Sequence, residues 1–144
     1  MIVTYNTHSP QETEAIGESL AHQLIRAGRR RAFIAMRGEM VVGKTAFARG
    51  FGRALGADRI KSPTYTVVSE HKGDPVPFFH FDTYRIQDSD DLWSIGYDDY
   101  LARDGYILCE WSENIEGDIP DGAIYVTIRR TDDGCGREIV TEGL

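Results

Sequence analysis

The chain has 144 residues, of which 41% are hydrophobic and 27% charged, a profile typical of one globular domain. Its net charge of −7 excludes extensive nucleic-acid binding, and its two cysteines and four histidines lack the spacing of a disulfide framework or a zinc site. No apolar run is long enough to span a membrane and no secretory leader is recognisable, so we expect a cytoplasmic protein without membrane contact.

The first predicted elements are a strand and a helix. Residues 1–6 read as a short strand. Ser9 is then expected as the N-cap of a helix, with Pro10 at its first position and Glu12 completing a capping box. Apolar side chains recur every four residues along this helix, and Gly28 is expected to end it.

A second strand and helix flank a glycine-containing turn. Residues 31–37 predict a buried strand because their central positions are continuously apolar. A helix is predicted to begin after Gly43 and to run to about Leu55, where Gly56 stops it.

The second half of the chain predicts a strand pair, two short helices, a buried strand and a closing hairpin. These elements occupy residues 64–71 with 75–85, residues 88–105, residues 106–111, and residues 123–130 with 137–143. Strands and helices mixed at these intervals predict an α/β fold: a single domain over residues 1–144, with three layers, a mixed sheet and antiparallel edge strands.

The turn between the second strand and its helix carries a phosphate-binding motif. Residues 38–45, Gly-Glu-Met-Val-Val-Gly-Lys-Thr, match G-x-x-x-x-G-K-[ST] in its proper strand-to-helix context, which predicts a P-loop NTPase-like fold. Backbone N–H groups of such a loop form an anion-binding nest, and the helix N-terminus adds its dipole. The alternative is a turn that contains Lys-Thr by coincidence.

Each part of the motif has an expected role. Lys44 would neutralise the β- and γ-phosphates, and the Thr45 hydroxyl would coordinate Mg²⁺. The expected ATP-binding residues are Gly38, Glu39, Met40, Val41, Val42, Gly43, Lys44, Thr45, Ala46 and Phe47.

Hydrolysis also requires an acid that holds Mg²⁺ and a group that orients water. Asp82 and Glu110 each follow an apolar predicted strand. We assign Glu110 to Mg²⁺ or its water shell and expect Asp82 beside it. The alternative for either acid alone is a strand end that faces solvent.

Two further features follow the predicted P-loop helix and the buried strand. Ser62, Pro63 and Thr64 lie where many P-loop hydrolases have a switch segment, so Thr64 is a candidate contact of Mg²⁺, its water shell or the attacking water. The alternative is a proline turn that enters a strand. Trp111 is either a packing residue or an exposed contact for a partner protein.

Five motifs in this order resemble the bacterial TsaE family. They are GxxxxGKT, SPTYT, HFDTYR, DDYL and EWSE, and they cover nearly the whole chain. The family comprises small P-loop ATPases required to make threonylcarbamoyladenosine at position 37 of tRNA. The resemblance implies a Mg²⁺-dependent ATPase that is weak alone, is stimulated by a partner complex of TsaD and TsaB, and meets tRNA only indirectly.

The resemblance also implies roles for individual residues. Catalytic roles fall on Lys44, Asp82, Thr64 and Glu110, metal contacts on Thr45 and Glu110, and partner or coupling roles on Ser62, Pro63 and Trp111. Residues 7–10 and 129–130 would approach the adenine. Relatives typically carry Gly-Ala where this chain has Val41 and Val42, a departure that bears on nucleotide affinity or turnover.

Two other functions stay open at this point. A small-molecule kinase shares the P-loop, although the chain has little room for an acceptor-binding subdomain and a lid. A nucleotide-dependent interaction module that does not hydrolyse ATP is the other, and the two valines in the loop keep it open.

Overall fold

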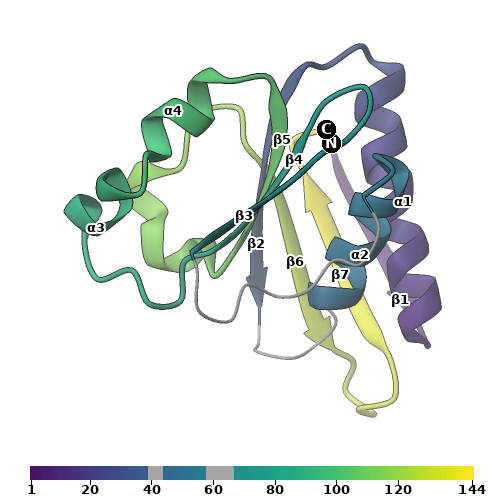
Figure 1. Ribbon diagram of the computed structural model, residues 1–144. Helices are drawn as coiled ribbons and strands as arrows, with labels where there is room; N and C mark the ends of the chain where they lie inside the picture. The colour runs from purple at the N-terminus through teal and green to yellow at the C-terminus, as the bar shows by residue number, and fades with distance from the viewer. Residues whose placement is uncertain (39–43, 58–66) are drawn as a thin grey trace.

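The structure, a computed structural model, describes residues 1–38, 44–57 and 67–144 (Figure 1). Within these residues the elements are, in chain order, β1 (Ile2–Thr7), α1 (Pro10–Arg26), β2 (Arg31–Gly38), α2 (Lys44–Ala54), β3 (Val68–His71), β4 (Phe78–Asp82), α3 (Ser89–Ser94), α4 (Tyr97–Ala102), β5 (Gly105–Glu110), the 3₁₀ helix η1 (Ser112–Asp118), β6 (Ile124–Arg130) and β7 (Arg137–Glu142).

The described strands form one mixed sheet in the order β1-β7-β6-β2-β5-β4-β3. Its centre is parallel, because β2 pairs in parallel with β5 and β6, and β5 with β4. Both edges are antiparallel: β3 on β4 at one side, and β7 between β6 and β1 at the other. The predicted three-layer α/β fold with a mixed sheet and antiparallel edge strands is confirmed.

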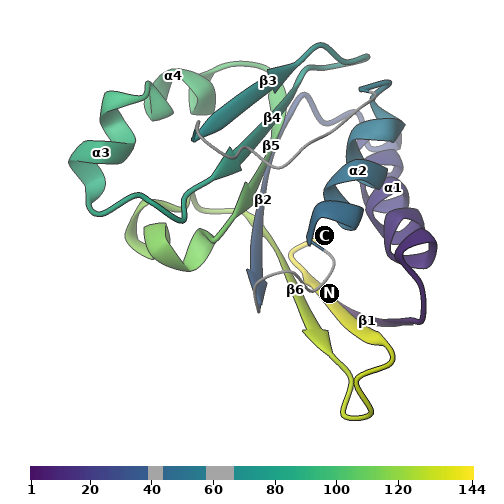
Figure 2. The same cartoon turned by 60° about the horizontal axis from the view of Figure 1, so that its bottom comes forward.

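Helices cover both faces of the sheet (Figure 1). The turned view in Figure 2 shows α1 and α2 packed side by side on one face, with α3 and α4 on the other. Successive side chains of a strand point to opposite faces of the sheet. In β2, Ile34 and Met36 pack in the hydrophobic cluster under α1 and α2. Phe33 and Ala35 pack in the cluster under α3, α4 and η1.

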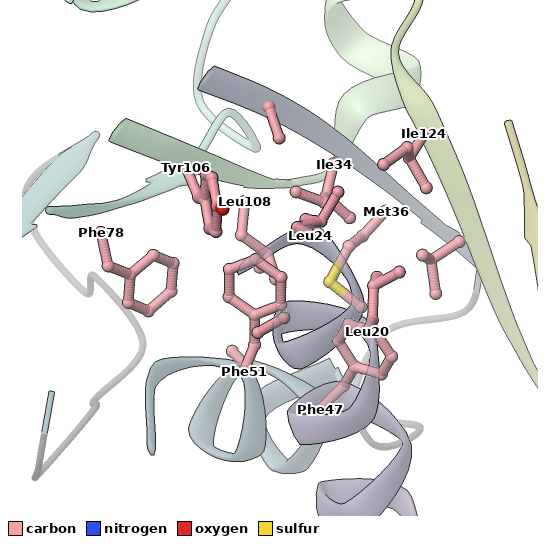
Figure 3. Close-up of a cluster of buried hydrophobic side chains, with 14 of the residues drawn as sticks. Leu20, Leu24, Ile34, Met36, Phe47, Phe51, Phe78, Tyr106, Leu108 and Ile124 are labelled. Atoms are coloured by element: carbon pink, nitrogen blue, oxygen red, sulfur yellow. The ribbon is translucent and has the colours of Figure 1, made fainter. Parts of the chain in front are cut away.

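The larger core lies between the sheet and the α1–α2 pair. Figure 3 shows Leu20 and Leu24 of α1 and Phe47 and Phe51 of α2 reaching towards Met36 and its neighbours on the sheet. Phe47 and Phe51 are both fully buried. Burial of a side chain of this size stabilises the fold by about 1.5–3 kcal/mol, so α2 is firmly anchored to the sheet.

The N-terminus of α1 is capped nearly as the sequence predicts. The Ser9 hydroxyl accepts a hydrogen bond from the Glu12 N–H at 3.2 Å. The Glu12 carboxylate, however, accepts from the N–H of His8 at 2.6 Å, one residue before the N-cap, so the reciprocal bond of a capping box is displaced by one position. The helix ends at Arg26, shortly before Gly28, whose φ is +73°.

The α1 and α2 backbones touch, because glycine lies at each point of closest approach. A Cβ added at Gly50 would lie 1.8 Å from the carbonyl oxygen of Glu14, and one added at Gly17 would lie 2.2 Å from the carbonyl oxygen of Phe47. This contact leaves no room for a side chain, so it sets where α2 begins relative to α1.

Some bounds differ from the predicted ones. Strand β4 spans Phe78–Asp82 rather than residues 75–85, because the Asp82 side chain accepts a hydrogen bond from the N–H of Tyr84 and turns the chain away. The part of the predicted strand 64–71 that precedes residue 67 lies outside the described residues. No helix in the described part of the chain combines the length and apolar composition that a bilayer span requires.

Candidate functional site

A cavity of about 580 Å³ opens where the parallel strands β4 and β5 end and α2 begins. Its volume is within the range of small-molecule sites, and its position at the carboxyl ends of parallel strands is the usual place for a ligand in such a fold. The lining residues are Thr7, His8, Ser9, Pro10, Thr13, Lys44, Thr45, Ala46, Asp82, Tyr84, Glu110, Trp111, Cys135, Gly136 and Arg137.

Lys44 is the cationic centre of the cavity. It is the first residue of α2 and only 3% exposed. Within the described residues its ammonium has no hydrogen-bond partner, and it lies 4.5 Å from the centre of the Trp111 ring. A ring face is a weak substitute for an anion, and an unpaired buried charge is unfavourable. Lys44 and the start of α2 together therefore fit an anionic ligand.

Two carboxylates lie side by side in the same cavity. Asp82 ends β4 and Glu110 ends β5, and the sheet register places them opposite each other. Burial raises the pKa of the Asp82 carboxyl above its ordinary value; the hydrogen bond from the N–H of Tyr84 opposes this rise, and the Glu110 carboxylate adds to it. Neighbouring carboxylates of this kind favour a cation between or beside them.

The donor set fits Mg²⁺ held together with a phosphate. Among the described residues, no group of three or more His, Cys, Asp and Glu side chains is arranged as a cage for a metal ion. Mg²⁺ is commonly held by one or two carboxylates and substrate phosphates rather than by the protein alone. Glu110 supplies such a carboxylate, and Thr45 lines the cavity next to Lys44.

Trp111 forms a wall of the cavity in an unusual backbone conformation. Its φ of 61° and ψ of 37° are left-handed, which is an outlier for a bulky residue. The hydroxyl of Thr83 donates to its carbonyl oxygen at 2.7 Å, and its ring lies 4.8 Å from that of Tyr84. The left-handed turn carries the indole over the Lys44 ammonium, so Trp111 is not a core residue.

The other predicted site residues have different positions. Gly38 ends β2, and Ala46 lines the cavity. The Phe47 side chain is fully buried in the core against α1, which leaves only its backbone for a ligand. Eight predicted site residues lie outside the described residues: Glu39, Met40, Val41, Val42, Gly43, Ser62, Pro63 and Thr64.

The two segments expected to approach the adenine differ in whether they line the cavity. Residues 7–10 line it. Arg129 and Arg130, in contrast, end β6 with exposed side chains and do not line it; residues 135–137, from the start of β7 and the turn before it, take that place. The sequence analysis also missed His80, whose Nε2 lies 2.5 Å from a carboxylate oxygen of Glu110. Its position two residues before Asp82, on the same strand face, is the signal that could have revealed it.

Comparisons with known proteins agree with this architecture. The family model described as "Threonylcarbamoyl adenosine biosynthesis protein TsaE" matches residues 7–139. The chain is 35% identical over 131 residues to the tRNA threonylcarbamoyladenosine biosynthesis protein TsaE of Bacillus subtilis, covering 90% of this chain and 78% of the relative. It is 34% identical over 128 residues to the TsaE protein of Haemophilus influenzae, covering 88% and 81%.

A solved structure shows the same fold. The crystal structure of Bacillus subtilis YdiB superposes with a TM-score of 0.81 at 29% identity, over 100% of this chain and 87% of that chain. The family match spans most of the chain, including Lys44, Asp82 and Glu110. The chain therefore belongs to the TsaE family of threonylcarbamoyl adenosine biosynthesis proteins.

Proposed function

We propose that this protein is a Mg²⁺-dependent ATPase of tRNA threonylcarbamoyladenosine biosynthesis, weak alone and stimulated by a complex of TsaD and TsaB. The observation that carries the proposal is the buried ammonium of Lys44, unpaired within the described residues, in one cavity with Asp82 and Glu110. An anion for the lysine and a cation for the carboxylates are what Mg²⁺-ATP brings together.

Each side chain has a distinct task in this scheme. Lys44 leaves the Trp111 ring to pair with the β- and γ-phosphates, and the first turn of α2 donates N–H groups to them. Glu110 and Thr45 would hold Mg²⁺, which would supply positive charge to neutralise the phosphate oxygens. Asp82 would accept a hydrogen bond from the attacking water, an assignment that its register opposite Glu110 supports.

The nucleoside end of ATP is assigned to residues 7–10 and 135–137, which line the cavity and supply hydroxyl, ring and backbone groups. Lys44 and the carboxylates, which line the same cavity, are assigned to the phosphates. Residues 129–130 have no part in this scheme, because they do not line the cavity.

The partner contact is assigned to Trp111 and to the segment Ser62, Pro63 and Thr64, of which the last three lie outside the described residues. A partner that contacts this segment would stimulate turnover through it. With a net charge of −7, the chain is a poor surface for tRNA, which its partners would hold in the cytoplasm.

Phosphate release from ATP tests the proposal, measured with the chain alone and with purified TsaD and TsaB. We expect the chain alone to release phosphate slowly and TsaD with TsaB to stimulate the release strongly. We expect Lys44→Ala to abolish both the basal and the stimulated release. A complex that forms with bound ATP but without stimulated release would favour the non-hydrolysing interaction module instead. Transfer of the γ-phosphate to a compound in a metabolite panel would favour the kinase.

A further inference from the structure

His80 is a fully buried histidine behind the cavity. It lies on β4 two residues before Asp82, so both side chains are on the α2 face of the sheet. Its Nε2 is 2.5 Å from Oε2 of Glu110, which is itself only 6% exposed. His80 is not among the residues that line the cavity, so it is placed to act on Glu110 and not on the ligand.

The tautomer of His80 sets the direction of this hydrogen bond. An ionised carboxylate only accepts hydrogen bonds, so the positioning role requires Nε2 of His80 to carry the proton and donate it to Glu110. The other ring nitrogen, Nδ1, is buried and has no hydrogen-bond partner among the described residues. Among the described residues, the imidazole therefore makes its side-chain hydrogen bond to Glu110.

Packing fixes the ring as well. His80 stacks on Phe78 with ring centres 5.7 Å apart and an interplanar angle of 15°, and Phe78 is fully buried in the main core. The imidazole therefore packs with its face on a buried aromatic ring and contacts Glu110 through Nε2.

The donor restrains only one of the two carboxylate oxygens. With Oε2 of Glu110 held by His80, Oε1 is the oxygen available to a cation. A glutamate has several rotatable bonds, and a buried donor that selects one rotamer organises the site before the metal arrives. Loss of a side chain that hydrogen-bonds to a metal ligand typically lowers metal affinity or activity by roughly 10–100-fold.

We propose that His80 is a positioning residue that holds the Glu110 carboxylate in the orientation that receives Mg²⁺. This inference rests on the proposed function, because it needs Glu110 as the carboxylate on the metal side. It adds a residue whose role follows from its hydrogen bond and burial.

Two variants of similar polarity separate the hydrogen bond from the ring. His80→Gln places an amide nitrogen near the position of Nε2, whereas the shorter His80→Asn places it near Nδ1 and out of reach of Glu110. The measurement is calorimetric binding of the non-hydrolysable analogue AMPPNP at a series of Mg²⁺ concentrations and in EDTA. We expect His80→Asn to need about 10–100-fold more Mg²⁺ for half-maximal tightening, and His80→Gln to stay near the wild type. Affinity in EDTA should be the same in all three proteins.

Several outcomes would overturn the positioning role. They are an unchanged Mg²⁺ requirement in His80→Asn, an equal loss in both variants, and a loss of affinity that is the same in EDTA. A wild-type protein whose AMPPNP affinity ignores Mg²⁺ would instead overturn the proposed function itself. The nitrogen NMR shifts of His80 in the wild-type protein supply a test that needs no variant: a protonated Nε2 is expected, and a bare Nε2 would contradict the hydrogen bond.

Discussion

At the scale of one residue, the buried position of Lys44 is expected to lower the free energy of unfolding while leaving its ammonium available to a ligand. Its ammonium is buried against the Trp111 ring, and the described residues offer it no hydrogen bond. Burial of a charge without a hydrogen-bonded partner is unfavourable even though the Asp82 carboxylate attracts this ammonium across the cavity, and the strained turn at Trp111 adds to that cost. An anionic ligand relieves the lysine, so part of the binding energy comes from a penalty already present in the free protein.

This view predicts that Lys44→Met stabilises the ligand-free protein. Methionine keeps the length of the side chain and removes the charge, so we expect the free energy of unfolding to rise by about 1–2 kcal/mol. Stabilisation by added ATP should disappear in the same variant. Urea unfolding with and without ATP measures both effects. Lys72→Met, at an exposed lysine outside the cavity, is the control and should change neither. A destabilised Lys44→Met would contradict the argument.

The two cysteines provide a second prediction at this scale. Cys109 is fully buried, and burial raises the pKa of its thiol to about 12, whereas Cys135 is exposed and lines the cavity. Iodoacetamide at pH 8 should therefore alkylate only Cys135 in the native protein and both thiols after denaturation. Bound ATP should slow the reaction of Cys135 severalfold, as mass spectrometry can follow.

The control for this labelling is Cys135→Ser, which should not be alkylated in the native state. Rapid native labelling of Cys109 would show that β5 opens far more readily than its burial indicates. A Cys135 rate that ignores ATP would place the nucleotide away from the wall formed by residues 135–137.

At the scale of elements, the contact between α1 and α2 positions the part of the cavity lined by Lys44 and Thr45. Lys44 and Thr45 open α2, and the direction of that helix depends on how closely it lies against α1. Gly17 and Gly50 allow backbone-to-backbone contact there, with no space for a β-carbon. The site therefore depends on two glycines that do not line the cavity.

Gly50→Ala should force the two helices apart. A Cβ there would lie 1.8 Å from the Glu14 carbonyl oxygen, so we expect a loss of about 1–3 kcal/mol in unfolding free energy, the usual cost of overpacking, together with weaker ATP binding. Thermal unfolding and calorimetry measure the two effects. Gly117→Ala in η1, where a Cβ meets nothing within 4 Å, is the matched control and should be nearly neutral. Equal effects in the two variants would refute the packing argument.

The elements also show which features local sequence can predict. Helix α1 could be foreseen because Ser9, Pro10 and the apolar repeat are all local signals, and β2 and β5 because each is a continuous buried run. The 3₁₀ helix η1 could not, because its start depends on the left-handed turn at Trp111 and on a bond from the Ser112 hydroxyl to the Met36 carbonyl oxygen, 76 positions away in the chain.

The same distinction holds in the site. The proximity of Lys44, Asp82 and Glu110 is predictable from sequence. Parallel strands bring their carboxyl ends to one edge of the sheet, where Asp82 and Glu110 end β4 and β5 and where Lys44 begins the helix after β2. The wall at residues 135–137 depends instead on how the β6–β7 hairpin lies against the start of α1, which no local pattern encodes. His80 was missed because an isolated histidine in an apolar run reads as a core residue until its partner is known.

At the scale of the whole molecule, a ligand that binds the native state alone must stabilise it. Free Mg²⁺-ATP at about one hundred times its dissociation constant should add roughly 2.7 kcal/mol to the free energy of unfolding and raise the midpoint of thermal unfolding. At the same ATP concentration, EDTA should reduce the shift, because the proposed scheme has Mg²⁺ link Glu110 to the phosphates. Differential scanning calorimetry of the three samples measures this, and equal midpoints with and without ATP would contradict a nucleotide site.

The place of β7 in the sheet has a consequence for how the protein is made. Strand β7 lies between β1 and β6, and Ile2 pairs with Glu142. The ribosome synthesises β1 first and β7 last among the described strands, so β1 has no sheet neighbour until residues 137–142 have emerged. The cavity lacks its wall at residues 135–137 for the same interval. A nascent chain that ends before residue 135 therefore lacks one wall of the proposed nucleotide site.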